Sequence, residues 1–576
     1  MSLHFPMMHT SLCITARKVL AYCGLVVLAA VGAGPLVAQQ PVGIHPAMDL
    51  SVVDSHHVTR YGMGAKAQGP VNFSALPEWS EAAAASAGVH AVPSHHLGTE
   101  LSLSGLFAPL SSAVLPQPAS APYGSRTLVE PMVFNGYTSP SPSLTFGGVN
   151  SLDSGYIPPD SDGAVSATYV VTAVNGALLV HDRSGNRLNI KSLDSFWGIS
   201  TTQTYYSYDP TIEYDKFNDR WILTCCAGAN SSNGAILLAV SQTGDPSGNW
   251  YRWTTYPDAY FPHVILSTGS CDWPDFGKMG FNKNWIVVQT NMYQYKGNFV
   301  GSFISVFNKA SMYAGQNAGG SVSYTLYSLD SSYNVTQTPA VSNDNSVNAL
   351  YLLQNWSGSG KQLRLYKVDG SVSSPTFSLV GAPTGGSAWG DGDAFPLNFA
   401  PQAGAPNGLD AGTFRIGNAV YRDGYIWGAQ AVLLNNKSVI QWWQIGTDSS
   451  VAQQGRIDET DGYFRSFPSI AVNKYDNAMI GYSRFSSGEY AGGAYTFYVQ
   501  GTPGGTTEHE VLYKPGQAPY MSGQGEIDPI TQAPITVYRW GDYSRTMIDP
   551  SDDLHFWTIQ EYALGNYQWG TWWAHV

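Results

Sequence analysis

The sequence is poor in charged residues, and those it has are mostly acidic. Asp, Glu, Lys and Arg make up 12% of the 576 residues, and the net charge is −13. Proteins that bind nucleic acid need clustered Lys and Arg to neutralise phosphates, and no domain-sized basic region is found here. We therefore expect no nucleic-acid partner.

Cysteines are few and do not have the spacing of a zinc site. Of the 5 cysteines, only Cys225, Cys226 and Cys271 follow residue 38. One disulfide is reasonable in an exported protein. Cys225 and Cys226 are neighbours on an expected strand and point to opposite faces, so only one of them can meet Cys271. Which one pairs is left open, and no metal site is predicted from the cysteines.

Long apolar runs are confined to the N-terminus. Arg17 and Lys18 precede an apolar run over residues 19–31, and small residues follow up to Ala38. This order is typical of a secretory signal, and the run is shorter than the roughly 20 residues that a membrane span needs. We predict a signal peptide over residues 1–38, a secreted or periplasmic protein and no membrane span.

Sustained periodicity is missing from the next segment. Residues 39–125 are rich in Ala, Ser and Pro, and we expect them to form a poorly ordered leader. The folded domain is predicted over residues 126–576. Aromatic residues make up 13% of the chain, and 61 Gly and 34 Pro supply turns. This composition favours an all-β protein with many short strands.

A spacing of eleven residues recurs through that domain. In each copy a Pro, or once a Phe, leads into a short strand, and a large apolar residue opens a stronger strand eleven positions later. The pairs are Pro158 with Tyr169, Pro210 with Trp221, Pro274 with Trp285, Pro339 with Leu350, Phe414 with Tyr425, and Pro468 with Met479. Turn-forming runs such as Asp215–Asp219 separate the two strands. A looser copy follows Asp542.

The copies start 50 to 75 residues apart, which suits one four-stranded propeller blade with its loop. The sequence therefore predicts an all-β, seven-bladed β-propeller, with six or eight blades as alternatives. A solenoid of stacked strands is the less favoured alternative. The last copy shows only three strands, and a closed ring needs a fourth. We expect residues 128–135 to supply it.

Three segments carry a resemblance to a known group of proteins. They are residues 158–165 (PPDSDGAV), Asp209-Pro210-Thr211, and residues 540–544 (WGDYS). The chain resembles a family of uncharacterised secreted bacterial β-propeller proteins over residues 145–576, and its architecture is similar to that of sialidase-like propellers. The resemblance implies the propeller fold. It implies no assigned reaction.

Acids and arginines occupy the loops that lead into the inner strands. In propellers such loops open around the central channel, where ligands bind. Paired carboxylates can serve as general acid and as nucleophile or base toward a glycosidic bond, and Arg can hold a sugar carboxylate. We predict catalytic roles for Asp275, Asp542, Arg539, Arg415 and Tyr543, and substrate contacts for Asp162, Asp209, Arg465, Trp540 and Trp273.

A structural interpretation competes with this one, because an Asp in a loop commonly accepts backbone N–H bonds and repeated copies cannot all be catalytic. No cofactor is predicted, although the acidic Gly loops at residues 160–163 and 391–393 could ligate Ca²⁺. We expect a monomer that acts on polysaccharide or glycan as a hydrolase or lyase. The alternative is a non-enzymatic binding or adhesion propeller.

Overall fold

The computed structural model describes most of the chain from residue 58 onward. The described ranges are 58–87, 90–92, 136–200, 205–231, 233–255, 272–295, 299–315, 321–386, 388–390, 395–458, 461–527 and 533–576. The predicted signal peptide, residues 128–135, Cys271 and the loop 391–393 lie outside them.

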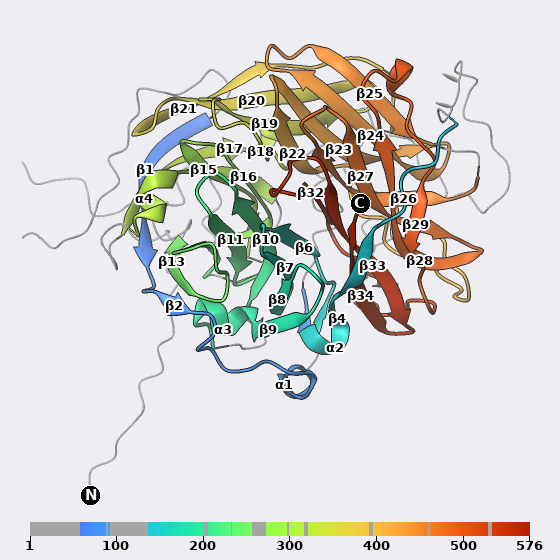
Figure 1. Cartoon of the computed structure of the whole chain (residues 1–576), viewed down its shortest axis with the longest axis horizontal. Helices are drawn as coiled ribbons and strands as arrows, with labels where there is room; N and C mark the ends of the chain where they lie inside the picture. Colours follow the sequence, from blue (N-terminus) through green and yellow to red (C-terminus); the bar gives the residue numbers. More distant parts are fainter. Residues whose placement is uncertain are drawn as a thin grey trace, which may run out of the picture.

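The fold is all-β and propeller-like. Antiparallel groups of four strands succeed one another around the molecule in chain order, from green through yellow and orange to red in Figure 1. The first groups are β6 (Asp162–Val165), β7 (Tyr169–Val174), β8 (Ala177–Asp182) and β9 (Arg187–Ser192); β10 (Ser207–Asp215), β11 (Arg220–Ala227), β12 (Ala235–Ser241) and β13 (Asn249–Thr255); and β14 (Asp272–Phe281), β15 (Trp285–Gln294), β16 (Phe299–Asn308) and β17 (Val322–Asp330).

The later groups follow the same plan. They are β18 (Thr338–Ser342), β19 (Leu350–Ser357), β20 (Gln362–Ser371) and β21 (Ser374–Gly381); β22 (Ile416–Arg422), β23 (Tyr425–Leu434), β24 (Lys437–Gly446) and β25 (Val451–Ile457); β26 (Phe464–Val472), β27 (Ala478–Ser486), β28 (Glu489–Tyr498) and β29 (Val511–Lys514); and β32 (Arg545–Ile548), β33 (Phe556–Gly565) and β34 (Gln568–His575) with β4 (Leu144–Asn150).

The remaining elements are short. They are β2 (Val71–Asn72), β3 (His90–Ala91), β5 (Tyr156–Ile157), β30 (Gln524–Ile527), β31 (Pro534–Val537), α1 (Glu81–Ala87), α2 (Ser151–Ser154), α3 (Leu193–Trp197), α4 (Lys309–Tyr313), and the 3₁₀ turns η3 (Ser331–Tyr333) and η4 (Pro503–Gly505). Among the described residues, no helix has the length and apolar character needed to cross a bilayer.

The first strand of each group lies on the inside and contacts the first strand of the next group. β6, β10, β14, β18, β22, β26 and β32 touch in this order, and β32 also touches β6. β18 and β22 even pair as parallel neighbours. The inner strands therefore surround a common axis, and their first residues share one end of it.

The ring is closed by a strand from the N-terminal side of the domain. β34 near the C-terminus pairs antiparallel with β4, with Trp573 opposite Phe146 and His575 opposite Leu144. A closing strand was expected at residues 128–135, which lie outside the described residues. The strand that pairs with the last group is instead residues 144–150, because these alternate toward β34 and lead directly into the first group.

The expectation of a poorly ordered leader is wrong for residues 58–87. β1 (Val58–Ala67) pairs with β17 along most of its length and with β13 at Lys66 and Ala67. It thus covers the outer edges of two neighbouring groups. Its side chains Tyr61, Met63 and Ala65 are buried against those groups, and they alternate with Gly62, Gly64 and Lys66 as in a strand with one covered face.

The spacing of eleven residues correctly marks the second strand of each group. β15, β19 and β23 begin at Trp285, Leu350 and Tyr425, the residues predicted to open a strand. The preceding turns are held by short polar side chains. Asp215 accepts from the backbone N–H of Phe217, and Asn473 accepts from that of Tyr475.

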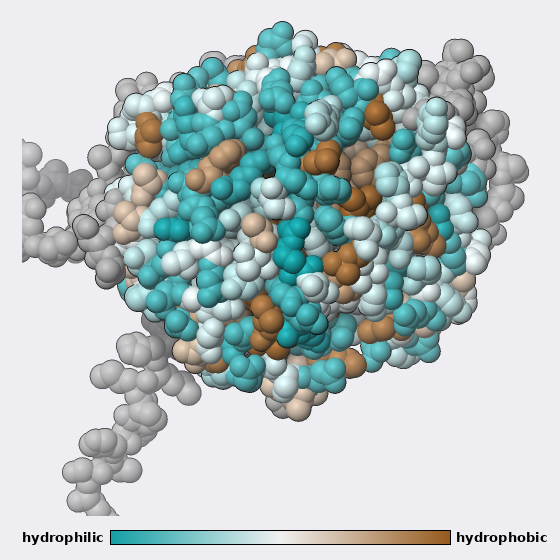
Figure 2. All heavy atoms as spheres, in the orientation of Figure 1, coloured by the Kyte–Doolittle hydropathy of each residue, from teal (hydrophilic) through white to brown (hydrophobic). Residues whose placement is uncertain are grey.

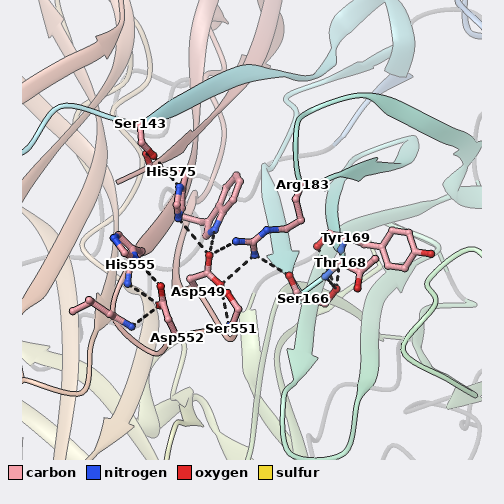
Figure 3. Close-up of polar contacts among 12 residues, drawn as sticks. Ser143, Ser166, Thr168, Tyr169, Arg183, Asp549, Ser551, Asp552, His555 and His575 are labelled. Carbon is pink, nitrogen blue, oxygen red and sulfur yellow. Dashed lines mark hydrogen bonds and ion pairs between the residues drawn. The ribbon is translucent and has the colours of Figure 1, made fainter.

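Asp549, in the turn between β32 and β33, ties the last group to the first (Figure 3). Its carboxylate forms an ion pair with Arg183 from the β8–β9 hairpin and accepts from Trp557 Nε1 at 2.9 Å. His575 Nε2 lies 3.4 Å from Asp549 Oδ2, and Ser143 Oγ lies 2.9 Å from His575 Nδ1. These contacts lower the pKa of Asp549 strongly, although burial alone would raise it.

We predict that Asp549→Ala lowers the free energy of unfolding by about 2–4 kcal/mol, because Arg183 and Trp557 lose a largely buried charged partner. Chemical denaturation followed by tryptophan fluorescence measures it. Asp552→Ala is the matched control: its partner His555 lies in the same turn but is half exposed, so the change should be below about 1 kcal/mol. Equal losses of unfolding free energy in the two variants would contradict the assignment of Asp549 as the residue that links the last strand group to the first.

Candidate functional site

A bulge at the start of the inner strands directs their first residues inward. In β10, β14, β22 and β26 two inner residues oppose one residue of the next strand, at Tyr208/Thr211, Asp275/Lys278, Ile416/Ala419 and Ser466/Ser469. Asp209 and Phe276 at these bulges have φ of 51°, and Asp160 before β6 has φ of 47°. Few residues other than Gly adopt this conformation without strain. The bulge therefore places Asp160 and Asp209 at corresponding positions in adjacent groups.

Three carboxylates meet at this end of the channel. One carboxylate oxygen from each of Asp160, Asp209 and Asp542 lies within 4.8 Å of the other two. Asn175 holds two of them: its Nδ2 donates to Asp160 Oδ2 at 2.6 Å, and its Oδ1 accepts from the Asp209 N–H at 2.9 Å. The N–H of Asp542 donates to Asp160 Oδ1 at 2.9 Å. We call Asp160, Asp209 and Asp542 the acidic cluster.

Further acids surround the acidic cluster. The pKa of Asp275 is raised to about 7, mainly by burial and also by the charges of Asp542 and Asp160. The charges of Arg415 and Arg539 oppose the shift. Burial also raises the pKa of Asp160 and Asp209, helped by their acidic neighbours. Negative charge is therefore disfavoured at this end of the channel unless it is compensated.

Two more carboxyl groups flank these. Glu561 on β33 is 5% exposed, and its pKa is raised by burial and by the charge of Asp160. Asp162 lies deeper, where burial raises its pKa to about 6 while Arg545 and Lys278 oppose the shift. Asp162 Oδ1 accepts from the N–H of Gly163 at 2.6 Å.

Arginines and a lysine lie among the acids. Arg539 Nη2 is 3.2 Å from Asp542 Oδ1, and Arg539 Nε is 3.6 Å from Asp410 Oδ2. The Arg415 guanidinium lies 4.8 Å from the centre of the Phe276 ring, on the Asp275 side of the site. Arg539 is only 1% exposed and Arg415 8%. Arg539 thus orients carboxylates within the protein, Arg415 packs against Phe276, and neither presents the open clamp for a sugar carboxylate that we expected.

Tyr543, for which a catalytic role was predicted, is buried beside Lys278. Its hydroxyl donates to Pro210 O at 3.0 Å, and Lys278 Nζ lies 3.3 Å from the centre of its ring. Burial raises the pKa of Tyr543 well above its ordinary value, and the surrounding carboxylates add to this. A phenol in this environment holds its proton, so Tyr543 supports Lys278 and the loop instead of attacking a substrate.

The two tryptophans predicted as sugar platforms are packed inside the protein. Trp540 is 1% exposed, meets Phe485 and Tyr520 edge-on, and donates to Ser483 Oγ at 3.0 Å. Trp273 is fully buried between aromatic rings of the β10 and β14 groups. Neither indole has a face open to a ligand. Figure 2 shows only small, separate hydrophobic spots on the face it draws.

Arg465, predicted to contact substrate, belongs to a different ion-pair network. Its guanidinium is fully buried, donates to both oxygens of Glu510 at 2.9 Å, and pairs with Asp461. Arg484 Nη1 donates to the same Glu510 Oε1 at 2.8 Å. The side chain therefore fixes the β26–β29 group internally and is saturated by protein carboxylates.

Sequence reasoning missed several members of the site. Lys278, Asn175 and Asp410 were not singled out, and Glu561 was judged a strand-surface residue. Glu561 and Lys278 lie on strands where nearly every residue is buried, so alternation gave no sign of which side chains face the channel. The usable signal is a charged residue within an otherwise buried strand, which rarely occurs without a partner.

The opposite end of the inner strands surrounds a separate cavity. It is a small, partly open cavity of about 50 Å³, and Glu213, Lys216, Phe217, Phe281 and Arg545 are among its lining residues. Arg545 and Glu213 form an ion pair there. The acidic cluster does not line this cavity, so the two ends of the channel differ in chemistry.

Comparisons with known proteins give only distant structural similarities. No protein-family profile matches the sequence, and no curated protein matches it. Solved structures with a similar arrangement include an apocarotenoid oxygenase mutant from Synechocystis, at 9% identity and a TM-score of 0.32 over 72% of this chain and 74% of the other.

Two further similar structures come from other sources. A subtype N10 neuraminidase-like protein of A/little yellow-shouldered bat/Guatemala/060/2010 is 9% identical, with a TM-score of 0.28 over 61% of this chain and 96% of its own. A protein of unknown function from Dyadobacter fermentans is 10% identical, with a TM-score of 0.26 over 65% and 96%.

The Glu510 network predicts acid sensitivity. Burial alone would raise the pKa of Glu510, but Arg465, Arg484 and Tyr482 lower it to about 2. A carboxyl group with a lowered folded-state pKa stabilises the fold above its unfolded pKa near 4.5, and this stabilisation is lost as the pH falls toward 2. The stabilisation is on the order of 3 kcal/mol.

We expect Glu510→Gln to lose this stabilisation at pH 7 and to show a weaker decline in stability between pH 4.5 and 2 than the natural protein. Urea denaturation across this pH range measures both. Glu489→Gln is the comparison, because Glu489 pairs with the same Arg484 but is more exposed. A decline in Glu510→Gln as steep as in the natural protein would show that other groups cause it.

Proposed function

We propose that this protein is an exported β-propeller that hydrolyses glycosidic bonds at the channel end formed by the acidic cluster. The observation that carries the proposal is the convergence of Asp275, Asp542, Arg415 and Arg539 at one site, although they come from β14, the loop before β22 and the loop before β32. If these four residues lay on different faces of the protein, they could not form one active site.

The four-strand groups support a particular architecture. Each group has a short inner strand and the groups follow one another around the axis, so we infer a seven-bladed propeller closed by β4. The channel then has two mouths, and the loops that precede the inner strands surround the one with the acidic cluster.

Two carboxyl groups suit the two roles that hydrolysis needs. Asp275, whose pKa is raised to about 7, retains a proton near neutral pH and is suited to protonate the leaving oxygen. Asp542 has the most accessible side chain of the acidic cluster, at 21% exposure, and is held by Arg539. It is suited to act as nucleophile or to activate water.

The buried arginines of the site narrow the substrate class. Arg539 is engaged by Asp542 and Asp410, and both it and Arg415 are buried. Neither can clamp the carboxylate of a sialic or uronic acid through bidentate hydrogen bonds. We therefore propose neutral or amino-sugar polysaccharides as substrates, which favours hydrolase chemistry over the lyase chemistry that uronates undergo.

A binding propeller without catalysis is the second candidate. It is favoured by the burial of most of the carboxylates, since Asp160, Asp209 and Asp275 are 0%, 1% and 7% exposed. In that case ligand would contact only Asp542 and the surrounding loops, and the deeper acids would serve to shape the mouth.

We expect the purified protein to release reducing ends from at least one neutral or amino-sugar polysaccharide. Asp275→Asn and Asp542→Asn should each lower the rate by roughly 100-fold or more, because each removes a proton donor or a nucleophile. Asp369→Asn is the control, since Asp369 pairs with Lys367 on the exposed part of β20.

Release of reducing ends at undiminished rates by both variants would contradict the assigned roles. If the natural protein releases no reducing ends from any of the polysaccharides tested but is retained on an insoluble glycan, the result would support the binding propeller instead.

A further inference from the structure

Negative groups outnumber positive groups around the acidic cluster. The carboxyl groups are Asp160, Asp162, Asp209, Asp275, Asp410, Asp542 and Glu561, and the cations among them are Lys278, Arg415, Arg539 and Arg545. Seven acids therefore face four bases, and Arg545 is also paired with Glu213. Burying unpaired carboxylates is costly, so further positive charge or protons must compensate them.

Two buried carboxylate oxygens in the group have no hydrogen-bond donor. Asp209 Oδ2 accepts from the N–H of Phe276 at 2.7 Å, but Asp209 Oδ1 accepts from no protein group. Glu561 Oε1 also has no donor. Asp209 is 1% exposed and Glu561 5%, so bulk water does not reach them freely. Buried acceptors in this state usually have a partner that the protein itself does not supply.

Both side chains lie at the acidic cluster. Asp209 belongs to it, since one oxygen from each of Asp160, Asp209 and Asp542 lies within 4.8 Å of the other two. Glu561 lies beside it, since a methyl group at Gly541 would lie 3.2 Å from Glu561 Oε2 and 3.8 Å from Asp160 Oδ1. Two oxygens that bind one Ca²⁺ at 2.3–2.6 Å can be at most about 5 Å apart. The limit of 4.8 Å is therefore compatible with one shared ion.

We propose that Asp160, Asp209 and Asp542 bind one divalent cation of the calcium class, with Glu561 beside them as a further oxygen ligand. The donor set consists of oxygens alone, which favours a hard cation over zinc or copper. Asn175 and the backbone N–H of Asp542 fix the orientation of Asp160, so the site is preorganised. The cation lies among the first residues of β6, β10 and β32 and links three strand groups.

The sequence indicated Ca²⁺ sites only within single loops, at residues 160–163 and 391–393. The structure instead assembles the ligands from loops about 50 and 330 residues apart along the chain, where no local spacing motif exists. Within the 160–163 loop, Asp162 accepts from Gly163 N–H and faces Arg545 and Lys278, so it is not among the proposed ligands. The inference does not depend on the proposed glycan hydrolysis.

The test is calorimetric titration of untagged, chelator-treated full-length protein with CaCl₂, with MgCl₂ and ZnCl₂ in parallel. We expect one Ca²⁺ per chain and a Tm that rises with Ca²⁺ concentration, because the ion binds only the folded state. Asp209→Asn and Asp542→Asn should each weaken the affinity by about tenfold or more, because affinity follows the number of charged ligands.

Asp194→Asn is the matched control. Asp194 is equally buried, at 3% exposure, but its Oδ1 accepts from Ser207 N–H and Oγ and lies outside the acidic cluster. This variant should be less stable yet bind Ca²⁺ with unchanged stoichiometry. A loss of Ca²⁺ binding in Asp194→Asn equal to that in Asp209→Asn would overturn the assignment.

Other results would also overturn it. If the natural protein shows neither a heat of binding nor a Tm shift with any of the cations, protons neutralise the acids. Binding of Zn²⁺ alone contradicts the hard-cation assignment, and Ca²⁺ binding that survives Asp209→Asn and Asp542→Asn unchanged places the ion elsewhere. Ca²⁺ binding without any polysaccharide cleavage keeps this inference and rejects only the hydrolase proposal.

Discussion

The contact of each inner strand with the next around a common axis is the constraint on which the rest of the structure depends. Because all inner strands run in the same direction, residues at their starts meet at one end. Single acids from distant loops thereby become neighbours, as Asp160 and Asp542 do. A site built in this way needs no local motif. It needs only loops that enter several inner strands at the same end of the axis.

The positions of the strands could be predicted from the sequence because they rest on local chemistry. The pattern spans only about a dozen residues, as at Pro210 and Trp221. It consists of a Pro or Phe in the inner strand, a turn closed by Asp or Asn, and a large apolar residue eleven positions after the Pro or Phe. β1 was not found in this way. Tyr61, Met63 and Ala65 do alternate, but Gly62 and Gly64 between them have low strand propensity, and the pairing partners β13 and β17 lie more than 180 residues later.

The candidate site was predicted in part for the same reason. Asp542 beside Arg539 is a local pair, and the structure confirms their contact. Whether an aromatic side chain is accessible to a ligand depends on which residues pack over it. Phe485 and Tyr520 pack over Trp540. Residue type alone cannot show this. Lys278 and Glu561 were missed because burial of a charge is explained only by partners from other strands.

Pairing of β34 with β4 joins two ends of the domain that are made at different times. During synthesis β4 emerges first, and its partner edge is absent until residues 568–575 have been added. The first four-strand groups can form before that point, but the ring cannot close. An unpaired strand edge then persists through most of translation, and such edges promote association between chains. The nascent protein is thus expected to rely on chaperones or rapid export until its last residues are complete.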